Sequence, residues 1–302
     1  MSKDKQNDDS DIVRLKEQIL RSGFPLEIEI ASSLTQQFTT MDADISTSAY
    51  YLDKDDGKGR ELDIKAFIPI EPLKDESSLV FLNLLVESKN IPGNAWVFFR
   101  SPHRIDHSYN CTSVLDALEW VPREHHMFTY SKDLHLHNLP ITAVNDEYIL
   151  DKKTSNKKGN NLFEALVSLA KATSYEYESH KRGFQNLLLT EDLLDLNYIE
   201  IFCAAIVFSG EMYLAEEVEK GQNMRLTPVN HVGSYVDYVS GNYDIQLVVD
   251  VLHKRALRDF VNMILRDIEI FRKASDGEAG KSFRKELLKA RRWYMRKKHV
   301  QQ

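Results

Sequence analysis

The chain has few cysteines and no long apolar segment. Cys111 and Cys203 are its only cysteines among 302 residues, and they lie far apart without a Cys-x-x-Cys spacing. Neither a disulfide framework nor a structural zinc site is therefore indicated. No apolar stretch approaches the roughly 18 residues that span a bilayer, and residues 1–10 lack the apolar core of a signal peptide. We therefore expect a cytoplasmic protein with no membrane partner.

The sequence also has no linker rich in proline, glycine or serine between its two halves. Hydrophobic residues make up 42% of the chain and charged residues 28%, which is ordinary for a globular protein large enough to bury a sizeable core. We expect one domain over residues 11–273, with an elaboration around residues 100–160. Residues 1–10 are polar and predicted to be disordered. Residues 274–302 form a basic C-terminal helix or tail.

Charge is distributed unevenly along the chain. The net charge of −7 argues against indiscriminate binding to nucleic acid. However, residues 281–298 contain nine basic side chains against the single acid Glu286, and their apolar residues have helical spacing. Two interpretations stay open for this segment. It can be a terminal helix that packs on the body and solvates its charges, or an arm that contacts phosphates.

The most informative segment is the apolar run of residues 81–86, which ends on Glu87 and Lys89. Residues i and i+2 of a strand point to the same face, so this carboxylate and this ammonium emerge side by side from the strand. Leu84, Leu85 and Val86 are apolar on both faces, which is typical of a central strand. An ion pair on a solvated edge strand is the simpler interpretation of Glu-x-Lys, but the apolar run disfavours it.

Two earlier segments supply further carboxylates. Residues 60–68 read as a strand that carries Asp63, and residues 24–34 read as a helix that carries Glu27, with Pro25 in its first turn. The chain order is therefore a helix with Glu, a strand with Asp and a strand with Glu-x-Lys.

This order resembles the PD-(D/E)xK nuclease superfamily, whose restriction-endonuclease-like fold is shared with Holliday-junction resolvases and Mrr-type restriction enzymes. The resemblance covers about residues 20–100. It implies an α/β fold with a restriction-endonuclease-like α-β-β-β-α-β core, in a mixed sheet that additional C-terminal strands and helices extend.

The resemblance also implies a role for each motif residue. Asp63 and Glu87 would bind Mg²⁺ or Mn²⁺, Lys89 would position or activate the attacking water, and Glu27 would add an outer contact. The chain departs from the pattern at Leu62, where the family name has proline. Glu29 competes with Glu27 for the helix position, and Glu27 is preferred because it precedes the small Ala31 by one turn.

The chemistry of these residue types agrees with the resemblance. Phosphodiester cleavage requires a hard cation, and hard cations take carboxylate and water oxygens. Lysine adds a compact positive charge near the water or the phosphate. We expect magnesium-dependent hydrolysis of nucleic acid, and we expect DNA rather than RNA as the substrate. The sequence is also compatible with a homodimer or a larger complex. The alternative is a non-catalytic subunit of the same fold that binds nucleic acid or serves in assembly.

The remaining patterns predict the other elements, all as parts of one mixed sheet with helices on its faces. The turn at residues 53–59 reads as a solvated hairpin turn rather than a calcium loop, because no glutamate follows at EF-hand spacing. The histidines between residues 100 and 160 show no partner at metal-ligand spacing, so a histidine metal site is disfavoured. The expected elements are helices at residues 12–20, 113–120, from 161 and 254–271, and strands at residues 45–52, 90–99, 199–208, 211–215 and 244–251. The strand at residues 45–52 and the two strands that carry Asp63 and Glu87 are expected to form an antiparallel meander. The last two helices have apolar stripes that we expect to face inward: Leu162, Leu166, Leu169 and Ala170 in one, and Leu257, Val261, Ile264, Leu265 and Ile268 in the other.

Overall fold

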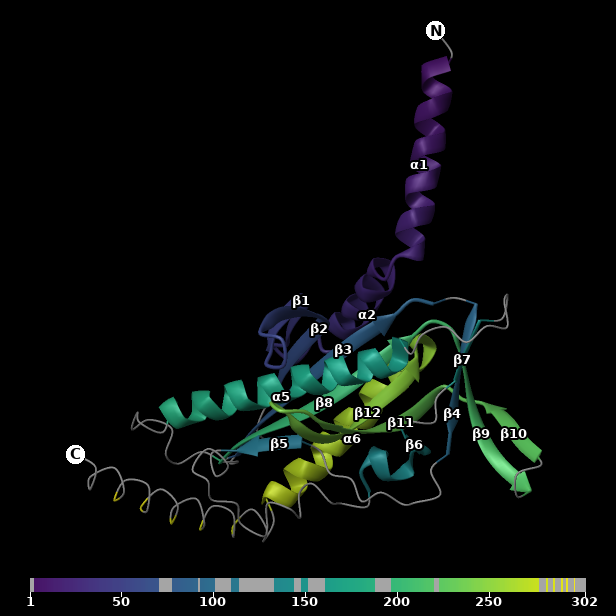
Figure 1. The fold of residues 1–302 in the computed structure, drawn as a ribbon. Helices are drawn as coiled ribbons and strands as arrows, with labels where there is room; N and C mark the ends of the chain where they lie inside the picture. The colour runs from purple at the N-terminus through teal and green to yellow at the C-terminus, as the bar shows by residue number, and fades with distance from the viewer. Residues whose placement is uncertain are drawn as a thin grey trace.

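The computed structural model describes residues 3–70, 78–91, 93–100, 110–113, 133–143, 148–151, 161–187, 197–219 and 223–276, and in the C-terminal tail Lys281, Lys285, Lys289, Arg292 and Arg296. It is an α/β protein with a large mixed sheet, a smaller second sheet and helices on both faces of the large one (Figure 1). None of the described helices is long and apolar enough to cross a membrane. The expected helix at residues 113–120 lies outside the described residues, apart from Ser113 itself, which ends a strand.

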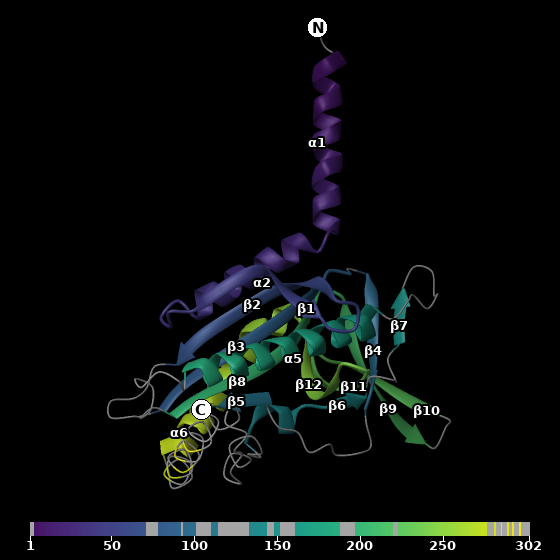
Figure 2. The ribbon, with the colours of Figure 1, turned by 60° about the vertical axis from the view of Figure 1, so that its left-hand side comes forward.

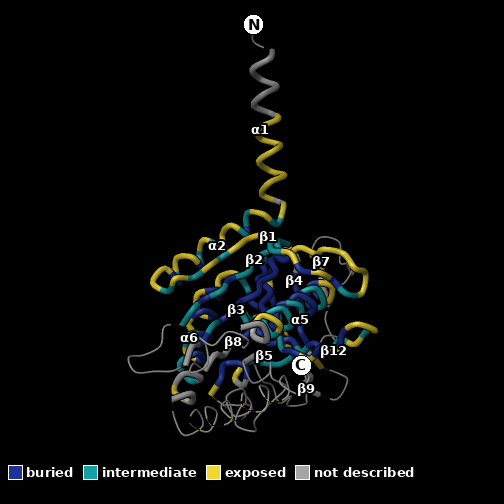
Figure 3. Tube along the Cα trace, turned by 90° about the vertical axis from the view of Figure 1, so that its left-hand side faces the viewer, coloured by how far each residue is buried: buried dark blue, intermediate teal, exposed yellow. Residues whose placement is uncertain are grey.

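Two helices open the chain. Helix α1 (Lys3–Arg21) includes residues 3–10, where the sequence predicts disorder, and so corrects that expectation. It projects from the body and exposes its apolar residues (Figures 1 and 3): Ile12, Val13, Leu15, Ile19 and Leu20. Helix α2 (Phe24–Gln37) has Pro25 in its first turn, as predicted, and buries Leu26, Ile30 and Leu34.

The antiparallel meander predicted from the sequence is confirmed. Strands β1 (Asp44–Asp53), β2 (Lys58–Ile70) and β3 (Ser78–Lys89) pair in chain order. The alternation of buried and partly buried residues along β2 shows that one side of each strand faces a core.

Strand β3 is a central strand, as its two apolar faces predict. Strand β8 (Asn197–Phe208) lies parallel to it over its whole length, from Ser78 opposite Asn197 to Lys89 opposite Phe208. Helix α5 (Asn161–Leu187) lies in the connection and covers one face of the sheet (Figure 2). In chain order, α2 precedes β1, β2 and β3, several short strands follow β3, and α5 and β8 come after them.

The large sheet continues beyond β8. Two strands share the edge of β8 that lies away from β3. Strand β12 (Asp244–His253) pairs parallel with the end of β8, and β5 (Asn110–Ser113) pairs antiparallel with the part of β8 nearer its start. Strand β11 (His231–Val239) pairs antiparallel with β12, and β6 (Ile141–Ala143) completes the sheet.

A second sheet corrects the expectation of a single mixed sheet. It contains β10 (Asn223–Pro228), β9 (Glu211–Glu219), β4 (Asn94–Phe99) and β7 (Tyr148–Asp151), in that order. The chain turns at Ser209 and Gly210, so that β9 leaves the large sheet instead of extending it. The Trp96 ring on β4 stacks on Phe208 of β8 at 3.9 Å between centroids, which packs the second sheet against the end of the first.

Two apolar cores lie on opposite faces of the large sheet. Helix α5 covers one of them with the stripe that the sequence predicts: Leu162, Leu166, Leu169 and Ala170. Helices α2 and α6 (Leu257–Asp276), the latter following a short 3-10 turn η4 (Lys254–Ala256), cover the other. The predicted inward residues of α6 are buried or partly buried there: Leu257, Val261, Ile264, Leu265 and Ile268.

The β1–β2 turn is not fully solvated, in contrast to the expectation. The Lys171 ammonium on α5 lies 3.0 Å from the Asp53 carboxylate and 2.8 Å from that of Asp55. Asp53 and Lys171 are both buried, and Asp55 also accepts hydrogen bonds from Tyr238 and Ser240. These charges attach the hairpin to α5 and to the loop after β11.

Replacement of Lys171 by methionine tests this attachment. The change leaves the buried Asp53 carboxylate with the Asp55 backbone N–H at 3.0 Å and an Arg60 group at 3.8 Å, so we expect the free energy of unfolding to fall by about 3–5 kcal/mol. In the control Lys54→Met, an exposed pair with Glu178 is removed and the loss should stay below about 1 kcal/mol. Urea denaturation at pH 7 measures both, and equal losses would contradict the assignment.

Candidate functional site

The predicted site residues meet where β2 and β3 run side by side. The antiparallel register that pairs Ile64 with Val86 leaves Asp63 opposite Glu87 one step further along. Directly opposite residues of an antiparallel pair point to the same face, which here is the face that α5 covers. The two carboxylates therefore leave neighbouring strands together, as the sequence predicts.

Direct contacts connect the motif residues. The backbone N–H of Ser88 donates a 2.7 Å hydrogen bond to Oδ2 of Asp63, which ties this carboxylate to β3. The Lys89 ammonium donates to Oε2 of Glu87 at 3.1 Å. Glu87 is buried, whereas the side chain of Lys89 keeps 28% of its surface exposed and faces the solvent side of the site.

Burial makes Glu87 an unusual carboxyl group. It raises the pKa of Glu87 to about 7, because ionisation away from water is costly; Asp63 raises the pKa further, whereas Lys89 opposes the shift. The site therefore places two carboxyl groups, those of Asp63 and Glu87, beside the one ammonium group of Lys89. A divalent cation bound there would favour the ionised form of both carboxyl groups.

The structure distinguishes between the two candidate glutamates of α2. Burial raises the pKa of Glu27, and the next largest cause is repulsion from Asp63, so Glu27 lies within electrostatic reach of the motif. Glu29 points elsewhere, because its carboxylate pairs with the Lys254 ammonium at 2.8 Å on the surface. Of the two, Glu27 is the residue that the fold brings to the site.

Two hydroxyl groups extend the site in a way that the sequence analysis missed. Oγ of Ser168 on α5 donates to Oε1 of Glu87 at 3.5 Å, and the Tyr51 hydroxyl on β1 lies 3.0 Å from the same Oγ. Ser168 lies within the long amphipathic pattern of α5, which gave no signal beyond core packing. These hydroxyls hold the Glu87 carboxyl from the helix side.

The backbone of β1 is irregular at the same place. Thr47 pairs with Ile64 and Ala49 with Leu62, so Ser48 lies opposite Asp63. Ser48 has a φ of 56°, in the left-handed region that residues other than glycine rarely adopt. Strained positions of this kind concentrate at functional sites, where the surrounding structure compensates for their cost.

Charged pairs continue along the α5 face of the sheet. Lys65 on β2 lies 2.6 Å from Glu176 of α5, and His180 lies 2.7 Å from Glu200 of β8. Burial lowers the pKa of His180, but hydrogen bonds to Glu176 and Glu200 outweigh it and raise that pKa to about 9. These pairs fix α5 over β2, β3 and β8 and so fix Ser168 relative to Glu87.

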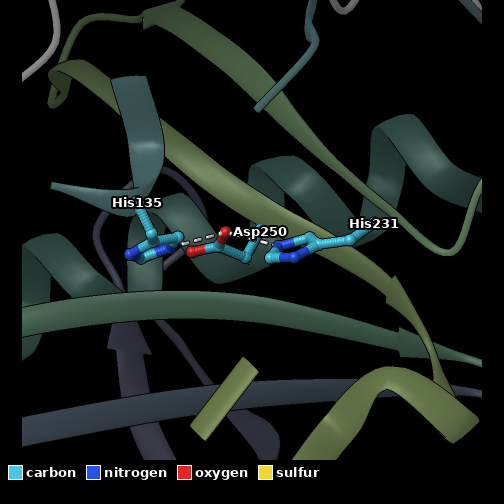
Figure 4. A group of neighbouring side chains, drawn as sticks. All are labelled: His135, His231 and Asp250. Carbon is cyan, nitrogen blue, oxygen red and sulfur yellow. Dashed lines mark hydrogen bonds and ion pairs between the residues drawn. The ribbon is translucent and has the colours of Figure 1, made fainter. Parts of the chain in front are cut away.

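A second polar cluster lies on the opposite face, and it changes the interpretation of His135. Nε2 of His135 lies 3.1 Å from Oδ1 of Asp250, and Nε2 of His231 lies 2.7 Å from the same oxygen (Figure 4). Burial lowers the pKa of His135, but Asp250 and Asp267 raise it to about 10; burial raises the pKa of Asp250, but the histidines lower it to about 2. His135 thus has the partners that its local sequence does not show, because they come from β11, β12 and α6. Five other histidines of residues 100–160 lie outside the described side chains.

The two clusters differ in the metal ions that they suit. Among the described residues, one ligand atom each from His135, His231 and Asp250 lies within 4.8 Å of the others. The carboxylates of Glu27, Asp63 and Glu87 do not converge this closely. Two oxygen donors are nevertheless sufficient for Mg²⁺, which keeps most of its water and uses substrate phosphate to complete its shell.

One cavity of about 620 Å³ lies elsewhere in the described part of the molecule. It is open to solvent and lies between the second sheet and the segment before β6, lined among others by Arg100, Pro140 and Arg225. None of the predicted site residues contributes to its wall. No protein-family model, curated protein or solved structure matches this chain, so the site has to be interpreted from its own geometry.

The raised pKa of Glu87 predicts a stabilising substitution. A carboxyl group with a folded pKa of about 7 and an ordinary value of 4.5 favours folding below pH 4.5, and this contribution is lost as the pH rises through 7. At pH 8 with chelator, the free energy of unfolding of Glu87→Gln should therefore exceed that of wild type by about 1–3 kcal/mol. The difference should shrink toward pH 5.

Thermal and urea unfolding over this pH range measure the effect. Glu61→Gln is the control, because it removes an exposed carboxylate of the neighbouring strand β2. It should change the free energy of unfolding by less than about 0.5 kcal/mol. A Glu87→Gln protein that is no more stable than wild type at pH 8 would contradict the electrostatic description.

Proposed function

We propose that this protein is a divalent-metal-dependent nuclease with a restriction-endonuclease-like core, acting on DNA. The observation that carries the proposal is the placement of Asp63 and Glu87 opposite each other on β2 and β3, with Lys89 bound to Glu87 and Glu27 within electrostatic reach. The order of α2, β1, β2, β3, α5 and β8, with β3 parallel to β8, supports the fold assignment.

The donor set fits magnesium or manganese. Both ligands are carboxylates, and a divalent cation bound between them would offset the cost of ionising the buried Glu87 carboxyl group. Asp63 and Glu87 would hold the ion. When bound, such an ion neutralises charge that develops on the phosphate and makes water more acidic.

The remaining residues have roles that follow from their contacts. The Lys89 side chain keeps 28% of its surface exposed, so its ammonium can turn from Glu87 to the scissile phosphate or the attacking water. Ser168 and Tyr51 hold Glu87 in place from α5 and β1. Glu27 lies at the start of α2, where it can accept a hydrogen bond from a water next to Asp63.

Substitutions of Lys89 test catalysis separately from binding. Its charge should act mainly as negative charge builds up in the transition state, so Lys89→Ala and Lys89→Met should cleave about 10²–10⁴ times more slowly than wild type and still bind DNA. The control Lys58→Ala removes an exposed lysine of β2 and should leave the rate unchanged. The substrates are plasmid, single-stranded DNA, branched DNA and RNA, each with and without magnesium or manganese.

The rates distinguish the proposal from its alternative, a non-catalytic subunit that binds nucleic acid or serves in assembly. The Lys89–Glu87 ion pair is the observation that favours this alternative, because a purely structural pair would look the same. Cleavage by wild type that Lys89→Ala and Lys89→Met do not slow would reject the active-site assignment. DNA binding without cleavage under any condition would favour the alternative, and cleavage of RNA alone would change the substrate.

The basic tail offers a separate prediction about substrate affinity. Its described residues are exposed and helical, at spacings that place them along one side of a helix: Lys281, Lys285, Lys289, Arg292 and Arg296. If this side contacts phosphates, a chain truncated after Gly280 should bind DNA more weakly, and its log affinity should fall less steeply with log salt concentration. An unchanged slope in fluorescence anisotropy titrations would assign the tail to another contact.

A further inference from the structure

Three elements far apart in the chain bring nitrogen and oxygen donors to one point beneath the large sheet. His135 begins the short 3-10 turn η1 (His135–Asn138), His231 begins β11, and Asp250 lies on β12. Figure 4 shows the two imidazole rings on either side of the Asp250 carboxylate. The cluster faces α6, on the side of the sheet away from α5 and the Glu87 carboxyl.

The hydrogen bonds of His135 leave one of its nitrogens directed at Asp250. Asp267 on α6 accepts from the backbone N–H of His135 at 3.1 Å and lies 2.5 Å from its Nδ1. When Nδ1–H donates to this carboxylate, the lone pair of Nε2 faces Oδ1 of Asp250 at 3.1 Å. Two lone pairs at this distance repel each other unless a proton or a metal cation lies between them. A carboxylate behind the far nitrogen is the usual outer support of a metal-binding histidine.

The distances are close to those of a metal shell. In a tetrahedral zinc site with bonds of about 2.0–2.1 Å, adjacent ligand atoms lie about 3.4 Å apart. The two His–Asp distances of 2.7 and 3.1 Å differ little from this value, so small side-chain rotations are sufficient to admit an ion. Two imidazoles and one carboxylate form a set that zinc binds readily, with water as the fourth ligand.

The side chains around the cluster hold the two imidazole rings in place. The Phe260 ring packs edge-on against both imidazoles, with centroids 6.1 and 5.6 Å away. Nδ1 of His231 is buried and has no hydrogen-bond partner among the described residues. The His231 ring is thus held by packing and by its contact with Asp250, so that its Nε2 and Nε2 of His135 face the same carboxylate oxygen.

We propose that His135, His231 and Asp250 form a zinc site that is structural rather than catalytic. The three side chains keep only 3–9% of their surface exposed, so a substrate has no access to the ion. The ion would join η1, β11 and β12, and Asp267 would add α6 to the same unit. This site is independent of the proposed nuclease centre, which lies on the other face and offers oxygen donors alone.

Zinc binding to chelator-stripped protein tests the proposal. Wild type should bind one equivalent by calorimetry, retain it by elemental analysis, and unfold at a higher temperature with zinc than without. Cobalt added in place of zinc should give the visible absorption of a tetrahedral site. His231→Ala and His231→Gln should lose the cobalt spectrum and weaken binding at least tenfold, while His253→Ala, which removes a histidine of β12 outside the cluster, should bind as wild type does.

Two further results separate this site from alternatives. Asp267→Asn should weaken zinc binding about 10–100-fold and keep the tetrahedral spectrum, because it alters only the support of His135. Asp63→Ala should leave zinc binding unchanged, whatever becomes of nuclease activity. Stripped, folded wild type that binds no zinc at micromolar concentration would overturn the proposal and leave the cluster as a buried ion-pair network. Equal affinity in wild type and in a folded His231 variant would also overturn it.

Discussion

The parallel pairing of β3 with β8 is the constraint on which the other features depend. A parallel neighbour requires a crossover, and α5 within this crossover covers one face of the sheet while α2 and α6 cover the other. Strand β3 therefore has to be apolar on both faces until it ends. Glu87 and Lys89 are the first charged side chains that it carries, at the place where the strand reaches Asp63 and the start of α2.

Buried charged groups have different partners on the two faces of the sheet. On the α5 face, burial is the main reason that Glu87 ionises reluctantly, while Lys89 favours its ionised form and Asp63 opposes it. On the α6 face, Asp250 and Asp267 each contact a histidine, and the histidines supply positive charge or metal-ligand nitrogens. A buried carboxyl group with a raised pKa is a candidate functional group, and this property of Glu87 supports the proposed function.

The sequence predicts the elements that depend on local pattern and on neighbours along the chain. The inward stripes of α5 and α6 follow from a periodicity of 3.6 residues, and the central position of β3 follows from its apolar run on both faces. The proximity of Asp63 and Glu87 is implied by the resemblance to a nuclease superfamily and not by periodicity. The second sheet could not be predicted, because β9 reads as a strand in either sheet and only the packing of Trp96 on Phe208 separates them. The partners of His135, the hydroxyls of Ser168 and Tyr51 and the attachment of Lys171 to the hairpin come from contacts between distant segments, for which a single sequence has no signal.

The central claim is that Asp63 and Glu87 hold a divalent ion at the end of β3. Anomalous diffraction from crystals soaked in manganese measures this directly, because the ion can be located without reference to activity. The proposal predicts a peak within bonding distance of carboxylate oxygens from both residues, about 2.0–2.3 Å for a hard divalent cation. A fully occupied crystal with no peak between these carboxylates, or with manganese at His135, His231 and Asp250 alone, would contradict it.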